Sequence, residues 1–232
     1  MPTQLYAIDR TGYVWVFDPT TLAIPTTTWS NPSLQPYPGQ ALGAIGFGNS
    51  KLLMSGLTGG LASYLYAVTP TQDSNNKYYL NEAALPVAMP NGTLQPSQMA
   101  IDTASQRIFV ADSARYLTAW SIGTSISQLN GSPYYPSNGD IKAQGVAYNA
   151  LANLVYTCCQ SSSGQDQLVV YNASSFPMAQ VSGSPFNLTL GLSQSNGDIA
   201  YDAANNRILI ACSLGLVVLN ASTYAPIAGS PF

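Results

Sequence analysis

Three polar residues stand at the end of the same predicted strand in three consecutive parts of the chain: Asp102, Asn149 and Asp202. Carboxylate and amide oxygens are the ligands that hard cations such as Ca²⁺ prefer. If the three strands line a common channel, these oxygens would form a ring at its mouth and bind a cation there. Asp and Asn also cap tight turns by hydrogen-bonding to their own backbone. We therefore favour hairpin capping and keep the cation site as the alternative.

The residues needed for acid–base catalysis are scarce. The chain has no histidine, which excludes Ser-His-Asp and Cys-His machinery and every His-ligated metal site. Its three cysteines, Cys158, Cys159 and Cys212, form no CxxC pair and no disulfide framework, so we interpret them as small buried apolar residues. The sequence thus predicts no catalytic constellation and no cofactor.

The composition limits the partners. Only 7% of the 232 residues are charged, against about a quarter in ordinary globular proteins. Seven basic and ten acidic residues provide no basic face for nucleic acid. No apolar run approaches the ~18 residues of a membrane span, and the start MPTQLYAIDR lacks the features of a signal peptide. We expect a surface solvated by uncharged polar groups, with no nucleic-acid binding and no membrane insertion.

The chain repeats itself about every 50 residues. Five similar apolar runs, each ending at a turn-forming residue, start at Tyr13, Tyr64, Tyr116, Leu168 and Leu216, which are 51, 52, 52 and 48 residues apart. The runs are rich in β-branched and aromatic residues, as strands are, and no helical period is sustained. The sequence therefore predicts a repeated β unit.

Each repeat contains more than one such run. A second run precedes each of the five, beginning at Leu5, Leu52, Ile108, Leu154 and Ile208, and a third precedes four of these, beginning at Ile45, Met99, Val146 and Ile199. A fourth run follows. We name the four strands A to D from the inside outwards. Four short antiparallel strands in every repeat are typical of propeller blades. We predict one all-β domain over 1–232, a five-bladed β-propeller with blades at 1–36, 37–90, 91–137, 138–188 and 189–232.

Several motifs resemble the YVTN/lactonase-like β-propeller repeats. They are MAIDTASQRIFVADSARYLTAW, IAYDAANNRILIAC, VFDPTTLA and a closing Gly-Ser-Pro-aromatic sequence that occurs three times. The resemblance implies a propeller fold, and the family includes enzymes, surface proteins and scaffolds. No catalytic histidine can be transferred from it. We expect Gly-Ser-Pro to end strand D, where the chain turns inward, with the following aromatic residue packing on the neighbouring blade.

The first repeat is short. Strand A begins 17 to 22 residues before strand C in the other repeats, and counting back 17 from Tyr13 passes residue 1. We therefore predict that the first blade lacks its innermost strand, which leaves Leu5, Tyr6, Ala7 and Ile8 at the inner edge. An open edge is rarely left unprotected. Three explanations of this edge are open: channel water solvates it, the chain is truncated at its N-terminus, or a strand donated by another chain pairs with it.

These features favour a non-enzymatic propeller that serves as a structural or adhesive module of a larger assembly. The expected partners are other protein subunits and surface glycans. A polar, weakly charged surface without an export signal suits a virion protein, such as a tail, fibre or capsid-decoration component of a phage or archaeal virus. The alternatives are a lactonase-like or carbohydrate-active hydrolase that uses Asp residues at the channel mouth, and a secreted cell-surface binding propeller.

Overall fold

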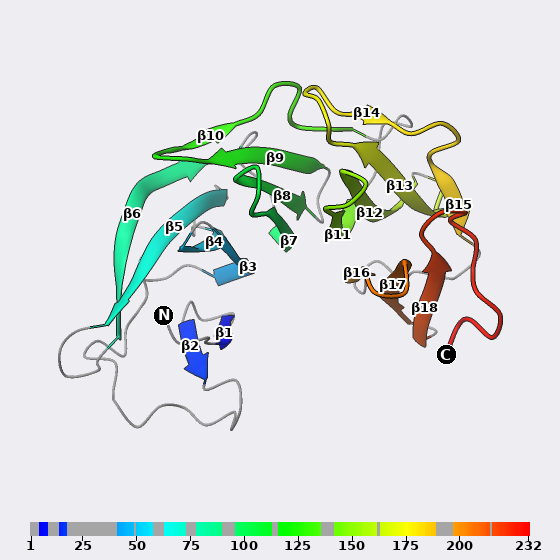
Figure 1. The fold of residues 1–232 in the computed structure, drawn as a ribbon, viewed down its shortest axis with the longest axis horizontal. Helices are drawn as coiled ribbons and strands as arrows, with labels where there is room; N and C mark the ends of the chain where they lie inside the picture. Colours follow the sequence, from blue (N-terminus) through cyan, green and yellow to red (C-terminus); the bar gives the residue numbers. More distant parts are fainter. Residues whose placement is uncertain are drawn as a thin grey trace. The chain divides into compact units, whose positions relative to one another are not determined.

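The described part of the chain folds into β-strands joined by turns (Figure 1). A computed structural model describes residues 5–8, 14–17, 41–48, 50–57, 63–72, 78–89, 96–112, 116–135, 142–161, 163–188, 197–213 and 215–232. Within these residues, no helix has the length and apolar character needed to span a bilayer. The chain divides into two compact units, which we describe separately.

The first unit comprises Met1–Leu94 and the short segment Gly123–Ile126. Its strands are β1 (Leu5–Ile8), β2 (Val14–Phe17), β3 (Ala41–Gly48), β4 (Lys51–Leu57), β5 (Ser63–Gln72) and β6 (Tyr78–Ala88). β1 and β2 form an antiparallel pair, and β3 to β6 form a four-stranded antiparallel sheet in chain order. Val14 of β2 packs with Leu52, Met54 and Tyr66 in one apolar cluster.

The second unit comprises Gln95–Ile122 and Ser127–Phe232. Its strands are β7 (Pro96–Asp102), β8 (Arg107–Asp112), β9 (Leu117–Ile122), β10 (Ile126–Gln128), β11 (Lys142–Asn149), β12 (Leu154–Gln160), β13 (Asp166–Asn172), β14 (Ala179–Gln180), β15 (Phe186–Leu188), β16 (Ile199–Asp202), β17 (Arg207–Cys212) and β18 (Gly215–Asn220). They form the antiparallel sheets β7–β10, β11–β15 and β16–β18, which belong to the third, fourth and fifth repeats.

The register of these sheets repeats as the sequence does. In the B–C ladders Arg107 lies opposite Ser121, Leu154 opposite Asn172, and Arg207 opposite Asn220. The predicted A, B and C strands of the third, fourth and fifth repeats are confirmed, and so is the all-β, antiparallel character of the fold. The predicted D strand of the first repeat lies outside the described residues.

The outer strand differs from the prediction at the Gly-Ser-Pro motif. In all three copies the serine Oγ accepts a hydrogen bond from a strand-C amide, and each bond measures 3.0 Å: Ala119 to Ser132, Val170 to Ser184 and Val218 to Ser230. Each serine amide also closes a turn onto the residue three positions earlier, at 3.1 Å. The glycines that begin the three motifs, Gly131, Gly183 and Gly229, have φ of +80°, +84° and +84°, a conformation that glycine adopts without steric cost.

The chain then returns to strand C instead of leaving the sheet. Tyr134 exchanges two backbone hydrogen bonds with Leu117, and Phe232 does the same with Leu216. In the fourth repeat β15 pairs with the start of β13, with Phe186 opposite Leu168. The motif is therefore a bulge within the outer strand. Because the serine hydroxyl replaces a missing ladder partner, the bulge leaves no strand-C amide at that point unsatisfied.

The core of the second unit lies between consecutive sheets. Residues directly opposite each other in a ladder share one face of the sheet, and we name the face that meets the next repeat the forward face. In the third repeat it carries Ala100, Phe109, Ala111, Leu117 and Ala119, and in the fourth repeat Ala147, Tyr156, Cys158, Leu168 and Val170. The first set packs against side chains of β11, β12 and β13, and the second against side chains of β16, β17 and β18.

Candidate functional site

The three residues proposed as cation ligands each hold a hairpin between strands A and B. Asp102 Oδ1 accepts a hydrogen bond from the Ser105 amide at 3.2 Å. Asn149 Oδ1 accepts hydrogen bonds from the amides two and three residues later, at 3.0 and 3.2 Å. Asp202 Oδ1 accepts the corresponding two bonds at the same distances. Each oxygen thus closes a turn of its own backbone, as short polar side chains do.

The hairpins complete their turns with three left-handed residues. Gln106, Asn153 and Asn206 have φ of +53°, +52° and +51°. Within the part of the chain that the structure describes, no three His, Cys, Asp or Glu side chains gather into a group that could hold a metal ion. The cation hypothesis for Asp102, Asn149 and Asp202 stays a prediction.

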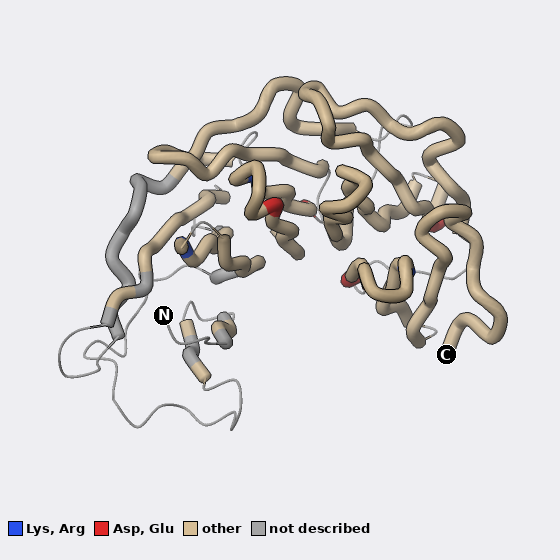
Figure 2. The backbone as a smooth tube through the Cα atoms, viewed as in Figure 1, with Lys and Arg blue, Asp and Glu red and all other residues tan. Residues whose placement is uncertain are grey.

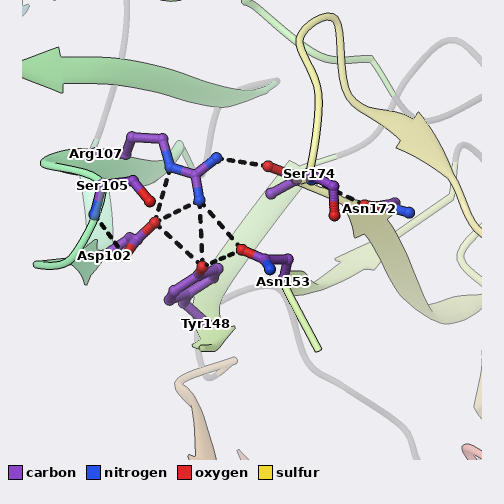
Figure 3. A network of polar contacts seen from close by, with 8 residues as sticks. Asp102, Ser105, Arg107, Tyr148, Asn153, Asn172 and Ser174 are labelled. Carbon is purple, nitrogen blue, oxygen red and sulfur yellow. Dashed lines mark hydrogen bonds and ion pairs between the residues drawn. The ribbon is translucent and has the colours of Figure 1, made fainter. Parts of the chain in front are cut away.

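A polar network that the sequence analysis missed is centred on Arg107, the first residue of β8 (Figure 3). Its guanidinium forms an ion pair with Asp102, and its Nε donates to Asp102 Oδ2 at 2.8 Å. Nη1 donates to the carbonyl of Ala173 at 2.5 Å, and Nη2 donates to Tyr148 Oη at 3.2 Å. Arg107 therefore joins its own hairpin to two parts of the fourth repeat.

Aromatic rings surround the guanidinium. Its Cζ lies 5.9 Å from the ring centroid of Phe109, 6.0 Å from that of Tyr148 and 5.4 Å from that of Phe176. These distances are within the range in which a ring face attracts a cation. Because Arg107 has both a carboxylate partner and ring contacts, its charge is compensated although the residue is buried.

The protonation states in the network follow from its geometry. Burial acts to raise the pKa of Asp102, but hydrogen bonds from Arg107 and Ser105 outweigh it and hold that pKa below its ordinary value. Burial, with the nearby charge of Asp102, raises the pKa of Tyr148. The Tyr148 hydroxyl stays protonated and donates within the network, where Asp102 Oδ2 lies at 3.1 Å and Asn153 Oδ1 at 2.8 Å. A carboxylate that is 3% exposed and occupied in this way is not open to a substrate.

The signal for this network was present in the sequence. The hairpins DTASQR and DAANNR share an Asp followed five residues later by an Arg, which gives Asp102 with Arg107 and Asp202 with Arg207. In a tight hairpin this spacing places the two residues opposite each other in the A–B ladder. The aromatic rings and the Ala173 carbonyl come from another repeat, so the sequence alone gave no sign of them.

A second polar side chain joins three inner strands. Gln98 of β7 accepts hydrogen bonds at Oε1 from the amides of Val146 (2.8 Å) and Ile199 (3.1 Å), and its Nε2 donates to the Ile199 carbonyl at 3.0 Å. Gly145 allows the strands and the Gln98 side chain to come this close, since a Cβ there would lie 2.1 Å from the Gly197 carbonyl oxygen and 2.7 Å from Gln98 Oε1. Gln98 thus ties β7, β11 and β16 together, near the starts of β7 and β16 and in the middle of β11.

The two adjacent thiols, Cys158 and Cys159, are not activated. Burial raises the pKa of Cys158 to about 12, and it raises the pKa of Cys159 as well. The Cys158 thiol donates to the Gly197 carbonyl at 2.5 Å, and the half-buried Cys212 thiol donates to the Gly215 carbonyl at 3.3 Å. All three cysteines are free. Neither Cys158 nor Cys159 has the low pKa that a thiolate nucleophile needs.

The predicted inner edge of the first repeat is the strand β1. Leu5 to Ile8 pair with β2 in an antiparallel register from Leu5–Phe17 to Ile8–Val14. The ring of Tyr6 stacks on Phe47 of β3, with centroids 5.9 Å apart and an interplanar angle of 7°. The side chains of Leu5 and Ile8 lie outside the described residues. Pairing of β1 with a strand from another chain stays a prediction.

Charge is sparse along the described backbone, as Figure 2 shows. The whole chain has a net charge of −3. In the second unit the described acidic and basic residues lie mainly at hairpins and strand ends, where Asp102 and Asp202 face Arg107 and Arg207 in the ladders. The chemistry offered by these groups is short-range bracing of turns and sheets.

Comparisons with known proteins indicate the fold. No family model matches the chain, and no curated protein matches it. The chain is similar to solved β-propellers. One is in a nidogen/laminin complex (TM-score 0.61, 12% identity, 94% of this chain and 74% of that chain). Another is the β-propeller domain of Cps50 (Swd1) from Myceliophteria thermophila (TM-score 0.55, 9% identity, 90% of this chain and 63% of that chain).

A third similar structure is a putative 6-phosphogluconolactonase from Bacteroides uniformis (TM-score 0.61, 11% identity, 96% of this chain and 68% of that chain). This chain thus spans between 63% and 74% of the length of these proteins. At such identities the likeness shows a β-propeller fold and nothing of function.

Proposed function

We propose that the chain is a five-bladed β-propeller without catalytic activity, and that it serves as a structural or adhesive module of a larger assembly. Five sequence repeats correspond to the five sheets of the described residues, if the β1–β2 pair is counted as a first blade that lacks its innermost strand. The proposed partners are other protein subunits and surface glycans.

The observation that carries the proposal is the use made of the ionisable groups. Asp102 and Arg107 are buried and fully engaged with each other and with the fourth repeat. Cys158 and Cys159 are buried thiols with raised pKa values. Groups that a hydrolase would present to a substrate are used here for cohesion between sheets, which supports a role based on surface shape rather than on chemistry.

Within this role we propose a virion component, such as a tail, fibre or capsid-decoration protein. The support is the weak charge of the chain, 7% of residues, which gives a polar surface without strong fields. Quantitative mass spectrometry of density-gradient-purified particles from the source culture tests this. The chain should co-purify at a constant ratio to the main coat protein, and its presence only in the soluble fraction would contradict the proposal.

The absence of catalysis is tested on the purified protein. A pH-stat assay with a panel of γ- and δ-lactones and of glycosides should give rates equal to buffer alone. Asp202 is the partly exposed acid among the proposed channel residues, so Asp202→Asn is the informative variant. Hydrolysis by the wild-type protein that disappears in Asp202→Asn would replace the proposal with the hydrolase alternative.

A further inference from the structure

Five Asn-x-Ser/Thr triplets occur along the chain, and the proposed function gives none of them a role. They begin at Asn91, Asn130, Asn172, Asn187 and Asn220. This triplet is the acceptor sequence for N-linked glycans, and an acceptor asparagine lies on the protein surface. Asn, Ser and Thr are also common in turns, so the triplet alone does not identify an acceptor. The geometry of each copy separates the two roles, except for Asn91, which lies outside the described residues.

The third triplet, Asn172–Ala173–Ser174, exposes both of the side chains that a glycosyltransferase recognises. Asn172 and Ser174 are exposed, whereas Ala173 between them is fully buried. The buried residue is held on both sides: its amide donates to the Asn153 carbonyl at 2.8 Å, and its carbonyl accepts from Arg107 of the preceding repeat (Figure 3). Fixing the middle residue in this way keeps the asparagine amide and the serine hydroxyl at the surface.

The Asn172 side chain presents its nitrogen and not its oxygen. Oδ1 accepts a hydrogen bond from the Ser174 amide at 2.9 Å, so the oxygen faces the backbone. No described residue accepts a hydrogen bond from Nδ2, whose two protons are therefore free for chemistry. The third and fifth sheets on either side of this repeat belong to the same compact unit. The surroundings of Asn172 are thus set within that unit.

The fifth repeat has the same arrangement at Asn220–Ala221–Ser222. Ala221 is buried, and its amide donates to the Asn206 carbonyl at 3.0 Å. Asn220 Oδ1 accepts a hydrogen bond from the Ser222 amide at 2.9 Å, and both residues are exposed. Ser222 Oγ accepts a bond from the exposed Asn206 side chain at 2.8 Å. Two consecutive repeats therefore carry the triplet in one geometry.

The triplets at Asn130 and Asn187 differ from these two. Asn130 is exposed, but its partner Ser132 accepts a hydrogen bond from the Ala119 amide at 3.0 Å and is part of the Gly-Ser-Pro bulge. Asn187 Oδ1 accepts a bond from Gln167 Nε2 at 2.9 Å, so its amide is engaged with a side chain of a neighbouring strand. In both copies one of the recognised groups already has a structural role.

We infer that Asn172, together with Asn220 as its counterpart in the fifth repeat, is an attachment site for an N-linked glycan. The inference goes beyond the proposed function, which includes no covalent modification. A glycan also suits a chain in which only 7% of residues are charged, because attached sugars solvate a protein surface.

The co-reactant is a sugar activated by a diphosphate, and a glycosyltransferase of the producing cell brings it to the asparagine. Asn172 Nδ2 forms a bond to C1 of the sugar, and the bond between C1 and the phosphate oxygen breaks. The diphosphate leaves with the electron pair of that bond. One proton of Nδ2 passes to a base of the transferase.

Glycopeptide mass spectrometry of the chain purified from its source tests the inference. Electron-transfer fragmentation keeps the sugar on its asparagine and so locates it. Peptides that contain Asn172, Asn220 or both should be heavier by one or more sugar residues. Peptides that contain Asn130 and Asn187 should have their unmodified masses, which makes these two triplets internal controls.

Variants of the full chain, secreted from a host that N-glycosylates exported proteins, test the role of the triplet. Ser174→Ala should lose the sugar on Asn172, since an enzyme that hydrogen-bonds a substrate hydroxyl strongly rejects a substrate without it. Ser175→Ala, at the next exposed serine, is the matched control and should keep the sugar. Asn172→Asp keeps an oxygen that can close the turn but has no acceptor nitrogen. Circular dichroism melting shows that each variant is folded.

Three results would overturn the inference. They are a chain from the source with unmodified masses at both Asn172 and Asn220, sugar on Asn130 or Asn187 in place of these sites, and a Ser174→Ala variant that keeps the sugar on Asn172. An unmodified chain that co-purifies with particles would overturn this inference and leave the proposed function standing. A glycosylated chain that is absent from particles would do the reverse.

Discussion

Arg107 and Arg207 occupy the same position in two repeats, with different consequences. Each begins strand B, and each lies opposite the Asp that ends strand A. Arg107 is buried and bound by the fourth repeat, whereas Arg207 is exposed. The local hairpins are nearly identical, so the burial of Arg107 comes from the fourth repeat. The fourth repeat supplies a carbonyl and aromatic rings that turn the motif into an internal brace, and among the described residues no such partners are seen for Arg207.

The largest contrast is expected between Phe109 and Leu209, which share one position of the forward face. Phe109 is fully buried, and Phe109→Ala should lower the free energy of unfolding of the second unit by about 3–5 kcal/mol through lost contacts and a cavity. Leu209→Ala, at a side chain that is partly exposed, should cost about 1 kcal/mol or less. Urea titrations followed by circular dichroism measure both, and equal costs would contradict the comparison.

The two arginines give the second contrast. Arg107→Met keeps much of the side-chain volume but leaves the Asp102 carboxylate buried without its cation, so a loss of about 3 kcal/mol or more is expected. Arg207→Met should change stability by no more than about 0.5 kcal/mol, as most surface substitutions do. The same urea titrations compare the two. A stable Arg107→Met variant would show that the network contributes little to cohesion.

The acid dependence of stability should follow Asp102. Its pKa is lowered in the folded chain, so the ionised carboxylate stabilises the fold above its unfolded pKa of about 3.9. That contribution is lost as the pH falls through the lower, folded pKa. The stability difference between wild type and Asp102→Asn should stay constant between about pH 5 and 8 and shrink below about pH 4.

Asp202→Asn is the control for this measurement. The hydrogen bond from Asn205 lowers the pKa of Asp202 in the same direction, but the carboxylate is exposed to solvent and screened. Its acid-dependent difference should be the smaller of the two. A larger effect at Asp202 than at Asp102 would contradict the assignment of the buried brace.

The smallest expected effect concerns the Gly-Ser-Pro bulge, in which the serine makes the same hydrogen bond in the fourth and fifth repeats. Ser184→Ala and Ser230→Ala each remove the acceptor of one strand-C amide, Val170 or Val218, and should each cost about 1 kcal/mol. Ser174→Ala, at an exposed serine, is the control. Similar costs at Ser184 and Ser230 would show that the bulge acts within one sheet. A much larger cost at Ser184 would show that it acts between sheets.

Much of the fold could be predicted because its signals are local. Alternating apolar residues with Asp or Asn at the strand ends placed the A, B and C strands of the third to fifth repeats correctly. The outer strand was harder, because the Gly-Ser-Pro motif looks like a terminator along the chain. Only the return of Tyr134, Phe186 and Phe232 to strand C shows that it is a bulge.

The candidate site was predicted less well, for a physical reason. Turn capping by Asp102, Asn149 and Asp202 depends on amides within three residues, and the sequence displays them. The role of Arg107 depends on Ala173, Tyr148 and Phe176, which lie more than 40 residues away. Contacts over such separations are set by the stacking of sheets and leave no local pattern.

The sequence by itself determined the repeat, the strand chemistry and the scarcity of catalytic groups, since each of these depends on residue type and short spacing. The tertiary structure decided which of the repeated faces are interior. Phe109 and Leu209, like Arg107 and Arg207, occupy equivalent positions along the chain and differ in burial. Burial is a property of neighbouring sheets, and it turns the same motif into core in one repeat and exposed surface in another.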